Sequence, residues 1–74
     1  MKIVIISNKD FLILEPTYIR VHHNGEASWL FLKGPGFELE KGFELTKSMA
    51  EAFQKLVLMG SEKIVVDLRK KVVY

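Results

Sequence analysis

The dipeptide Asn24-Gly25 constrains the fold of this chain more than any other feature of its sequence. It stands between two strand-like runs, Tyr18–His23 and Glu26–Lys33, which are rich in aromatic and β-branched residues. Both residues tolerate the positive φ that the central positions of a type I′ turn require, so the sequence predicts a β-hairpin with Asn24-Gly25 as its turn. That turn sets three cross-strand pairs: His23 with Glu26, Val21 with Ser28, and Arg20 with Trp29.

Side-chain alternation separates the hairpin residues onto two faces. One face is aliphatic and is the predicted floor for a helix: Ile19, Val21, Leu30 and Leu32. The other face carries rings with cations among them: Tyr18, Arg20, His22, Trp29, Phe31 and Lys33. On such a face bases can stack while cations hold phosphates. The alternative is that the rings are core, covered by the terminal strands or by a partner subunit, with Arg20 over Trp29 as a cation–π pair.

The remaining strands are read from short apolar runs and the turns between them. They are Lys2–Ser7, Phe11–Glu15, Phe37–Glu40 and Lys63–Leu68. A tight turn is predicted at Lys41-Gly42. After Leu68 two alternatives stay open, a turn near Arg69 or one edge strand that runs to Tyr74.

Thr46–Met59 is the one predicted helix, with Thr46 or Ser48 as its N-cap and Gly60 as its stop. Its apolar residues recur at helical spacing: Met49, Phe53, Leu56 and Val57. The predicted fold is therefore a single α+β domain over residues 1–74. It is an antiparallel sheet of four to six strands with one helix packed on one face, in the order β-β-β-β-(β)-α-β.

Composition narrows the expected compartment and partners. The chain has 74 residues, of which 49% are hydrophobic, and it has no cysteine. A secreted domain of this size usually needs disulfide staples, so their absence favours a reducing compartment and a cytoplasmic protein. Neither a leader sequence nor a membrane span is expected. The net charge of +2 permits a polyanionic partner, and the apolar content leaves room for a homodimer interface.

The sequence predicts no enzyme, cofactor or metal site. Its acidic residues are scattered, and no serine lies in a nucleophile motif. His22 and His23 are neighbours on a strand and point to opposite faces, which leaves His23 with Glu26 as the alternative ligand pair. The basic cluster Arg69-Lys70-Lys71 has two interpretations, a charged turn or edge that blocks aggregation, or a contact for phosphates.

The segment Lys41-Gly42-Phe43-Glu44-Leu45-Thr46, followed by Phe53 and Leu56, resembles the sheet-to-helix junction of the positive-cofactor-four family of single-stranded DNA-binding coactivators. The hairpin Tyr18–Lys33 is similar in order to the strands of that family, and the similarity covers residues 18 to 59. The resemblance implies a curved antiparallel sheet followed by one helix, a dimer, and nucleic-acid contact from the sheet. The contact residues would be Tyr18, Arg20, Trp29 and Phe31.

Two functional hypotheses follow from these patterns. The first is a non-catalytic single-stranded nucleic-acid binder that uses the face of rings and cations and forms a homodimer. The second is a protein–protein interaction module, a small regulator or inhibitor that docks by a sheet face or a strand edge. Its expected free edges are Phe11–Glu15 and Val72–Tyr74.

Overall fold

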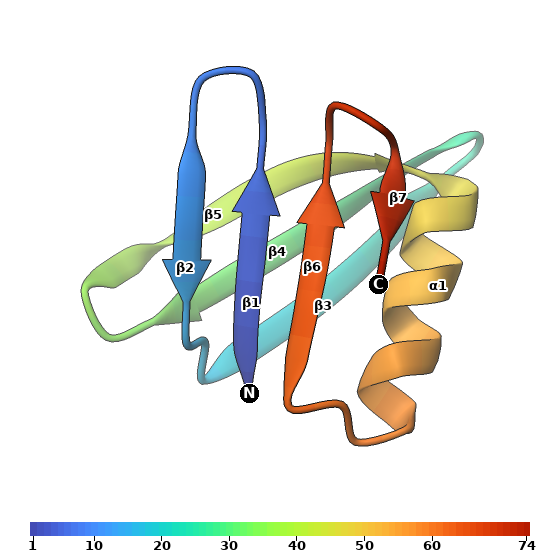
Figure 1. The fold of residues 1–74 in the computed structure, drawn as a ribbon. Helices are drawn as coiled ribbons and strands as arrows, with labels where there is room; N and C mark the ends of the chain where they lie inside the picture. The colour runs from blue at the N-terminus through green and yellow to red at the C-terminus, as the bar shows by residue number, and fades with distance from the viewer.

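Seven strands and one helix make up the described chain, and the strands divide between two sheets (Figure 1). The computed structural model describes residues 1–74, except for the side chain of Glu38. The elements are β1 (Lys2–Ile6), β2 (Phe11–Leu14), β3 (Tyr18–Asn24), β4 (Ala27–Gly34), β5 (Phe37–Thr46), α1 (Lys47–Leu58), β6 (Lys63–Asp67) and β7 (Val72–Val73). The four-stranded sheet has the order β2-β1-β6-β7, and the three-stranded sheet has the order β3-β4-β5. The predicted α+β class with one packed helix is confirmed, with the strands in two sheets rather than one.

The four-stranded sheet contains one parallel pair. β1 pairs antiparallel with β2 and parallel with β6, and β7 returns antiparallel to β6. A parallel pair needs a long crossover, which the three-stranded sheet and α1 provide. The chain reverses before β7, where Lys71 has a φ of 57°. Of the two alternatives after Leu68, the turn is therefore the one that forms.

The β3–β4 hairpin forms where it was predicted but turns one residue later. Asn24 pairs with Ala27, so Gly25 and Glu26 are the loop residues. Gly25 has a φ of 64° and Glu26 has a negative φ, which is the pattern of a type II′ turn. The predicted type I′ turn at Asn24-Gly25 is therefore wrong.

The later turn changes the cross-strand partners but not the faces. The observed pairs are His23 with Ser28, Val21 with Leu30, and Arg20 with Phe31, in place of the predicted ones. Each partner moves along its strand by two positions, and side chains alternate with a period of two. The aliphatic residues and the rings therefore stay on the opposite faces that the sequence predicted.

β5 runs without a break through the segment where a turn was predicted at Lys41-Gly42. It pairs with β4 along most of its length, and Gly42 lies opposite Phe31. A Cβ at position 42 would lie only 2.9 Å from Phe31 Cε1. The glycine therefore makes room for an aromatic ring inside a strand rather than for a turn.

α1 begins at the predicted cap. Thr46 Oγ1 accepts a hydrogen bond from the Met49 backbone N–H at 3.2 Å, so Thr46 rather than Ser48 is the N-cap. Gly60, with a φ of 75°, follows the last turn. α1 has twelve residues, and no helix of the described chain is long and apolar enough to cross a membrane.

The core lies between the two sheets, with α1 beside it (Figure 1). Its fully buried side chains come from both sheets and from the helix: Ile3, Ile5, Leu30, Leu32, Phe53, Ile64 and Val66. The aliphatic face of the β3–β4 hairpin therefore packs against the four-stranded sheet as well as against the helix. Each sheet turns its other face outward, and those two outer faces are the broad surfaces of the protein.

Candidate binding surfaces

The outer face of the three-stranded sheet carries the rings and cations that the sequence grouped together. We term it the ring face: Tyr18, Arg20, His22, Trp29, Phe31 and Lys33. Tyr18 is 39% exposed, and Trp29 and Phe31 are half-buried. The terminal strands do not cover these rings, because they form the sheet on the other side of the core.

The rings already stack on partners from the same chain. Trp29 and Phe31 are stacked, with ring centroids 6.2 Å apart and planes 18° apart. Arg20 Cζ lies 4.1 Å from the centroid of Phe31, so the predicted cation–π pair forms with Phe31 rather than with Trp29. Arg20 Nη2 also donates a hydrogen bond to Glu40 Oε1 at 3.3 Å. These contacts leave less of Phe31 and Arg20 available to a base or a phosphate.

Acidic residues of β5 share the ring face. Glu44 is the cross-strand neighbour of Trp29, and Glu40 bonds to Arg20. Their two negative charges offset the two positive charges of Arg20 and Lys33, so the net charge of the ring face is close to zero. A nucleic-acid surface ordinarily concentrates positive charge instead, because phosphate contacts dominate the affinity.

The two histidines of β3 point to opposite faces. His22 pairs with Trp29 on the ring face, whereas His23 Nδ1 lies 2.8 Å from the hydroxyl oxygen of the fully buried Ser28. The predicted pairing of His23 with Glu26 is wrong, because the β3–β4 turn forms one residue later than predicted. Among the described side chains, no three His, Asp or Glu residues gather as a metal site.

The basic cluster Arg69-Lys70-Lys71 forms the turn between β6 and β7, which Asp67 holds together. The carboxylate of Asp67 accepts hydrogen bonds from the backbone N–H groups of Arg69 and Lys70 at 3.0 and 3.1 Å. The Arg69 guanidinium also donates to it, and this side-chain hydrogen bond is the main cause that lowers the pKa of Asp67. The cluster therefore belongs to the four-stranded sheet, not to the sheet that carries the rings.

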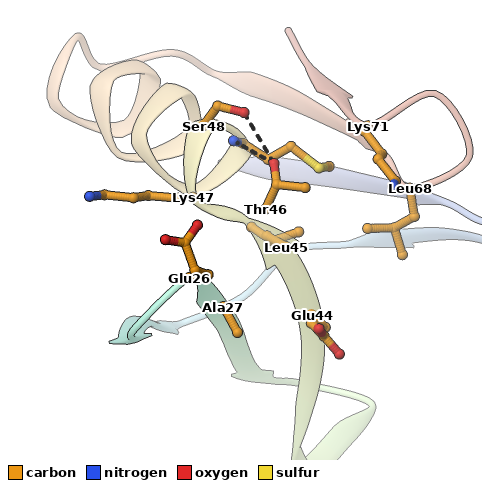
Figure 2. A pocket seen from close by; sticks show the side chains of 10 residues that line it. Glu26, Ala27, Glu44, Leu45, Thr46, Lys47, Ser48, Leu68 and Lys71 are labelled. Carbon is orange, nitrogen blue, oxygen red and sulfur yellow. Dashed lines mark hydrogen bonds between the residues drawn. The ribbon is translucent and has the colours of Figure 1, made fainter.

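A groove opens where β5 enters α1 (Figure 2). Its lining includes two carboxylates and two ammonium groups, from Glu26, Glu44, Lys47 and Lys71. The hydroxyls of Thr46 and Ser48 lie 3.1 Å apart, and Thr46 caps the helix. The Thr46 hydroxyl serves the helix end, the Ser48 hydroxyl bonds to it, and no histidine is among the residues that line the groove.

The outer face of the four-stranded sheet looks toward the viewer in Figure 1, and no helix or strand of the described chain lies over it. We term it the apolar face, after its apolar residues: Val4, Ile6, Phe11, Ile13, Val65, Val72 and Tyr74. Asp67, which is paired with Arg69, lies on the same face opposite Ile6 and Val72. Phe11 is 65% exposed, Ile13 57% and Tyr74 64%. Apolar residues that gather in this way on a protein surface mark contacts with other molecules.

The sequence contained part of the signal for this surface. β1 and β6 are unbroken apolar runs, which is typical of strands buried on both faces. Both faces are indeed largely buried: the core covers the inner side chains, and on the outer face Val4 is 5% exposed and Val65 9%, although no helix or strand of the described chain lies over that face. Lys2 and Lys63 are paired at one end of these strands, so their charges stand at the rim of the apolar face.

No protein-family model, curated protein or solved structure matches the chain. The resemblance to the positive-cofactor-four family therefore stays a prediction from residues 18 to 59.

Proposed function

We propose that the chain is a non-catalytic protein-binding module that docks through its apolar face. The observation that carries this proposal is the exposure of Phe11, Ile13 and Tyr74 on a sheet face whose other side chains are mostly aliphatic. Burying one large apolar side chain completely contributes roughly 1.5–3 kcal/mol. Phe11 and Ile13 are each more than half exposed, so most of that gain is still available to a partner.

The distribution of charge supports a protein partner. Lys2 and Lys63 lie at one end of the apolar face, and the Asp67–Arg69 ion pair lies at the other. Its centre is formed by Val4 and Val65, which are buried, so the exposed apolar area comes from Phe11, Ile13 and Tyr74. An apolar centre with a polar rim is the usual anatomy of a protein–protein interface. The strands Phe11–Leu14 and Val72–Val73, at the predicted free edges of the chain, are the two outer strands of this sheet.

A site-specific photo-crosslinker tests the proposal. Placed at Ile13, it should join the chain to a protein partner in native extract, whereas the same group at His22 on the ring face should not. The purified partner should then bind the wild-type chain, and Ile13→Lys should weaken that binding about tenfold or more because it places a charge within an apolar contact.

Trp29→Ala is the matched control, because it removes a large side chain from the other sheet. It should leave the affinity for the partner unchanged. Equal crosslinking at positions 13 and 22, or binding that Trp29→Ala weakens and Ile13→Lys does not, would contradict docking through the apolar face.

Single-stranded nucleic-acid binding is the second candidate function, and the outward position of Tyr18, Trp29 and Phe31 favours it. Trp29 is the single tryptophan, so its fluorescence reports directly on the ring face. Titration with a short single-stranded oligonucleotide should give saturable quenching that salt weakens, because phosphate contacts release counterions. An unchanged signal, or quenching that is independent of salt, would remove this candidate.

A further inference from the structure

We infer that Trp29 and Glu44 on the ring face form a binding site for a small molecule that carries one guanidinium group. The two residues are cross-strand neighbours on β4 and β5, so the site joins an indole ring to a carboxylate. This site is independent of docking through the apolar face, because the ring face belongs to the other sheet.

The ring face already holds one guanidinium, that of Arg20. Its Cζ atom lies 4.1 Å from the centroid of the Phe31 ring, and its Nη2 atom donates a hydrogen bond to Glu40 Oε1 at 3.3 Å. A planar guanidinium can stack on an aromatic ring while its edge donates to a carboxylate. One ring of β4 and one carboxylate of β5 therefore hold a guanidinium that β3 supplies.

The next row of cross-strand partners repeats the ring and the carboxylate but not the guanidinium. Trp29 lies two residues before Phe31 on β4, and its partner on β5 is Glu44. Its partner on β3 is His22, in the position that Arg20 has beside Phe31. Glu44 takes part in no ion pair among the described side chains. A carboxylate beside an aromatic ring is therefore available to a cation from outside the chain.

Two small residues leave the Trp29 ring accessible. A Cβ at Gly42 would lie 3.7 Å from Trp29 Cε3, so the indole reaches over β5, the strand that carries Glu44. On the other side of Trp29, towards the hairpin turn, β4 carries Ala27, whose methyl group is too short to cover an indole. Trp29 is half-buried and Glu44 is exposed, so both side chains can contact a ligand.

The charges of the ring face favour a ligand with a single cation. Glu44 attracts a positive group, whereas Arg20 and Lys33 on the same face repel any further one. A strongly cationic chain would meet that repulsion, but a small molecule with one guanidinium would not. Because one exposed ring and one exposed carboxylate each contribute weakly, the expected affinity is millimolar.

Titration of the isotope-labelled full chain with methylguanidinium at constant ionic strength tests the inference. Trp29 is the single tryptophan, so its indole N–H gives one resonance that reports on the site. Methylguanidinium should shift this resonance saturably, with a dissociation constant on the order of 10 mM. Methylurea is a neutral molecule of similar planar shape and should bind at least about fivefold more weakly. Methylammonium cannot stack and should bind at least about threefold more weakly.

Two substitutions and one control locate the binding. Glu44→Gln should raise the dissociation constant about threefold, because it removes the charge and keeps the shape. His22→Arg places a second guanidinium in the row of Trp29 and should raise the constant at least about fivefold, because it occupies the site from within the chain. Glu51→Gln removes a carboxylate from α1 and should bind like the wild type. All three substituted residues are exposed, so the variants should fold.

A shift that does not saturate, methylurea or methylammonium that binds as tightly as methylguanidinium, or a Glu44→Gln or His22→Arg chain that binds like the wild type each overturn the inference. Two other ligand classes are outcomes of the same titration. An arginine within a short capped peptide that binds more than about tenfold more tightly than methylguanidinium assigns the site to a protein. A single-stranded oligonucleotide that shifts the resonance when methylguanidinium does not assigns it to phosphates. Either result overturns the small guanidinium ligand.

Discussion

Gly42→Ala should disturb the ring face without altering a core residue. The new Cβ would lie 2.9 Å from Phe31 Cε1 and 3.1 Å from Phe31 Cδ1, whereas carbon atoms in contact are ordinarily about 3.5–4.0 Å apart. The Phe31 ring must therefore move and lose part of its contacts with Trp29 and Arg20. An aromatic pair contributes about 0.5–1.5 kcal/mol, and an exposed cation–π contact about 0.5–1 kcal/mol. Alanine regains about 0.5–1 kcal/mol over glycine within a strand.

These opposing effects make the sign of the substitution depend on Phe31. In the wild-type background Gly42→Ala should lower the free energy of unfolding by up to about 1 kcal/mol. In a Phe31→Ala background the obstacle is gone, so the same change should stabilise by about 0.5–1 kcal/mol. Urea unfolding followed by circular dichroism measures the four proteins of this double-mutant cycle, with an expected coupling of about 1–2 kcal/mol. Equal effects in both backgrounds, to within about 0.3 kcal/mol, would refute the packing of Phe31 over Gly42.

Three other substitutions test the core, the helix cap and the turn before β7. Phe53 is fully buried, so Phe53→Ala should cost about 3–5 kcal/mol in urea unfolding, and a midpoint near that of the wild type would contradict its place in the core. Thr46→Ala should cost about 1 kcal/mol by removing the bond to the Met49 N–H, whereas Thr46→Ser should retain most of the stability. The pKa of Asp67 is lowered from its ordinary value of 3.8, so its contribution to stability is complete above that pH and is lost as the pH falls through the folded-state pKa. The acid-induced loss of stability should therefore be smaller in Asp67→Asn than in the wild type, and parallel pH profiles would argue against this role.

Local chemistry explains where sequence reasoning was accurate. Thr46 caps α1 because its side chain and the Met49 N–H are close along the chain. The hairpin turns near Asn24-Gly25 because glycine accepts a positive φ, although a single residue's shift changed both the turn type and the partners of His23. The face assignment survived that error because side chains repeat every two residues along a strand.

Non-local contacts explain the errors. Gly42 was read as a turn residue, since nothing near it in the sequence indicates that the Phe31 ring lies over it. Arg20 was assigned to Trp29 because its partner depends on a register that one residue can shift. The neighbours of Glu40 and Glu44 were not predicted, because only the pairing of β5 with β4 placed Glu44 beside Trp29.

The sequence by itself determined the alternation of faces, the single helix with its cap, and the apolar character of β1 and β6, because each depends on residues a few positions apart. The tertiary structure decided that β1 pairs with β6 rather than lying beside the central hairpin, and therefore that Phe11, Ile13 and Tyr74 face outward on one sheet. The sequence of an apolar strand predicts that its side chains will be buried, but it does not identify the residues that bury them. That outcome depends on how much surface the rest of the chain can place over it, which is a property of the assembled fold.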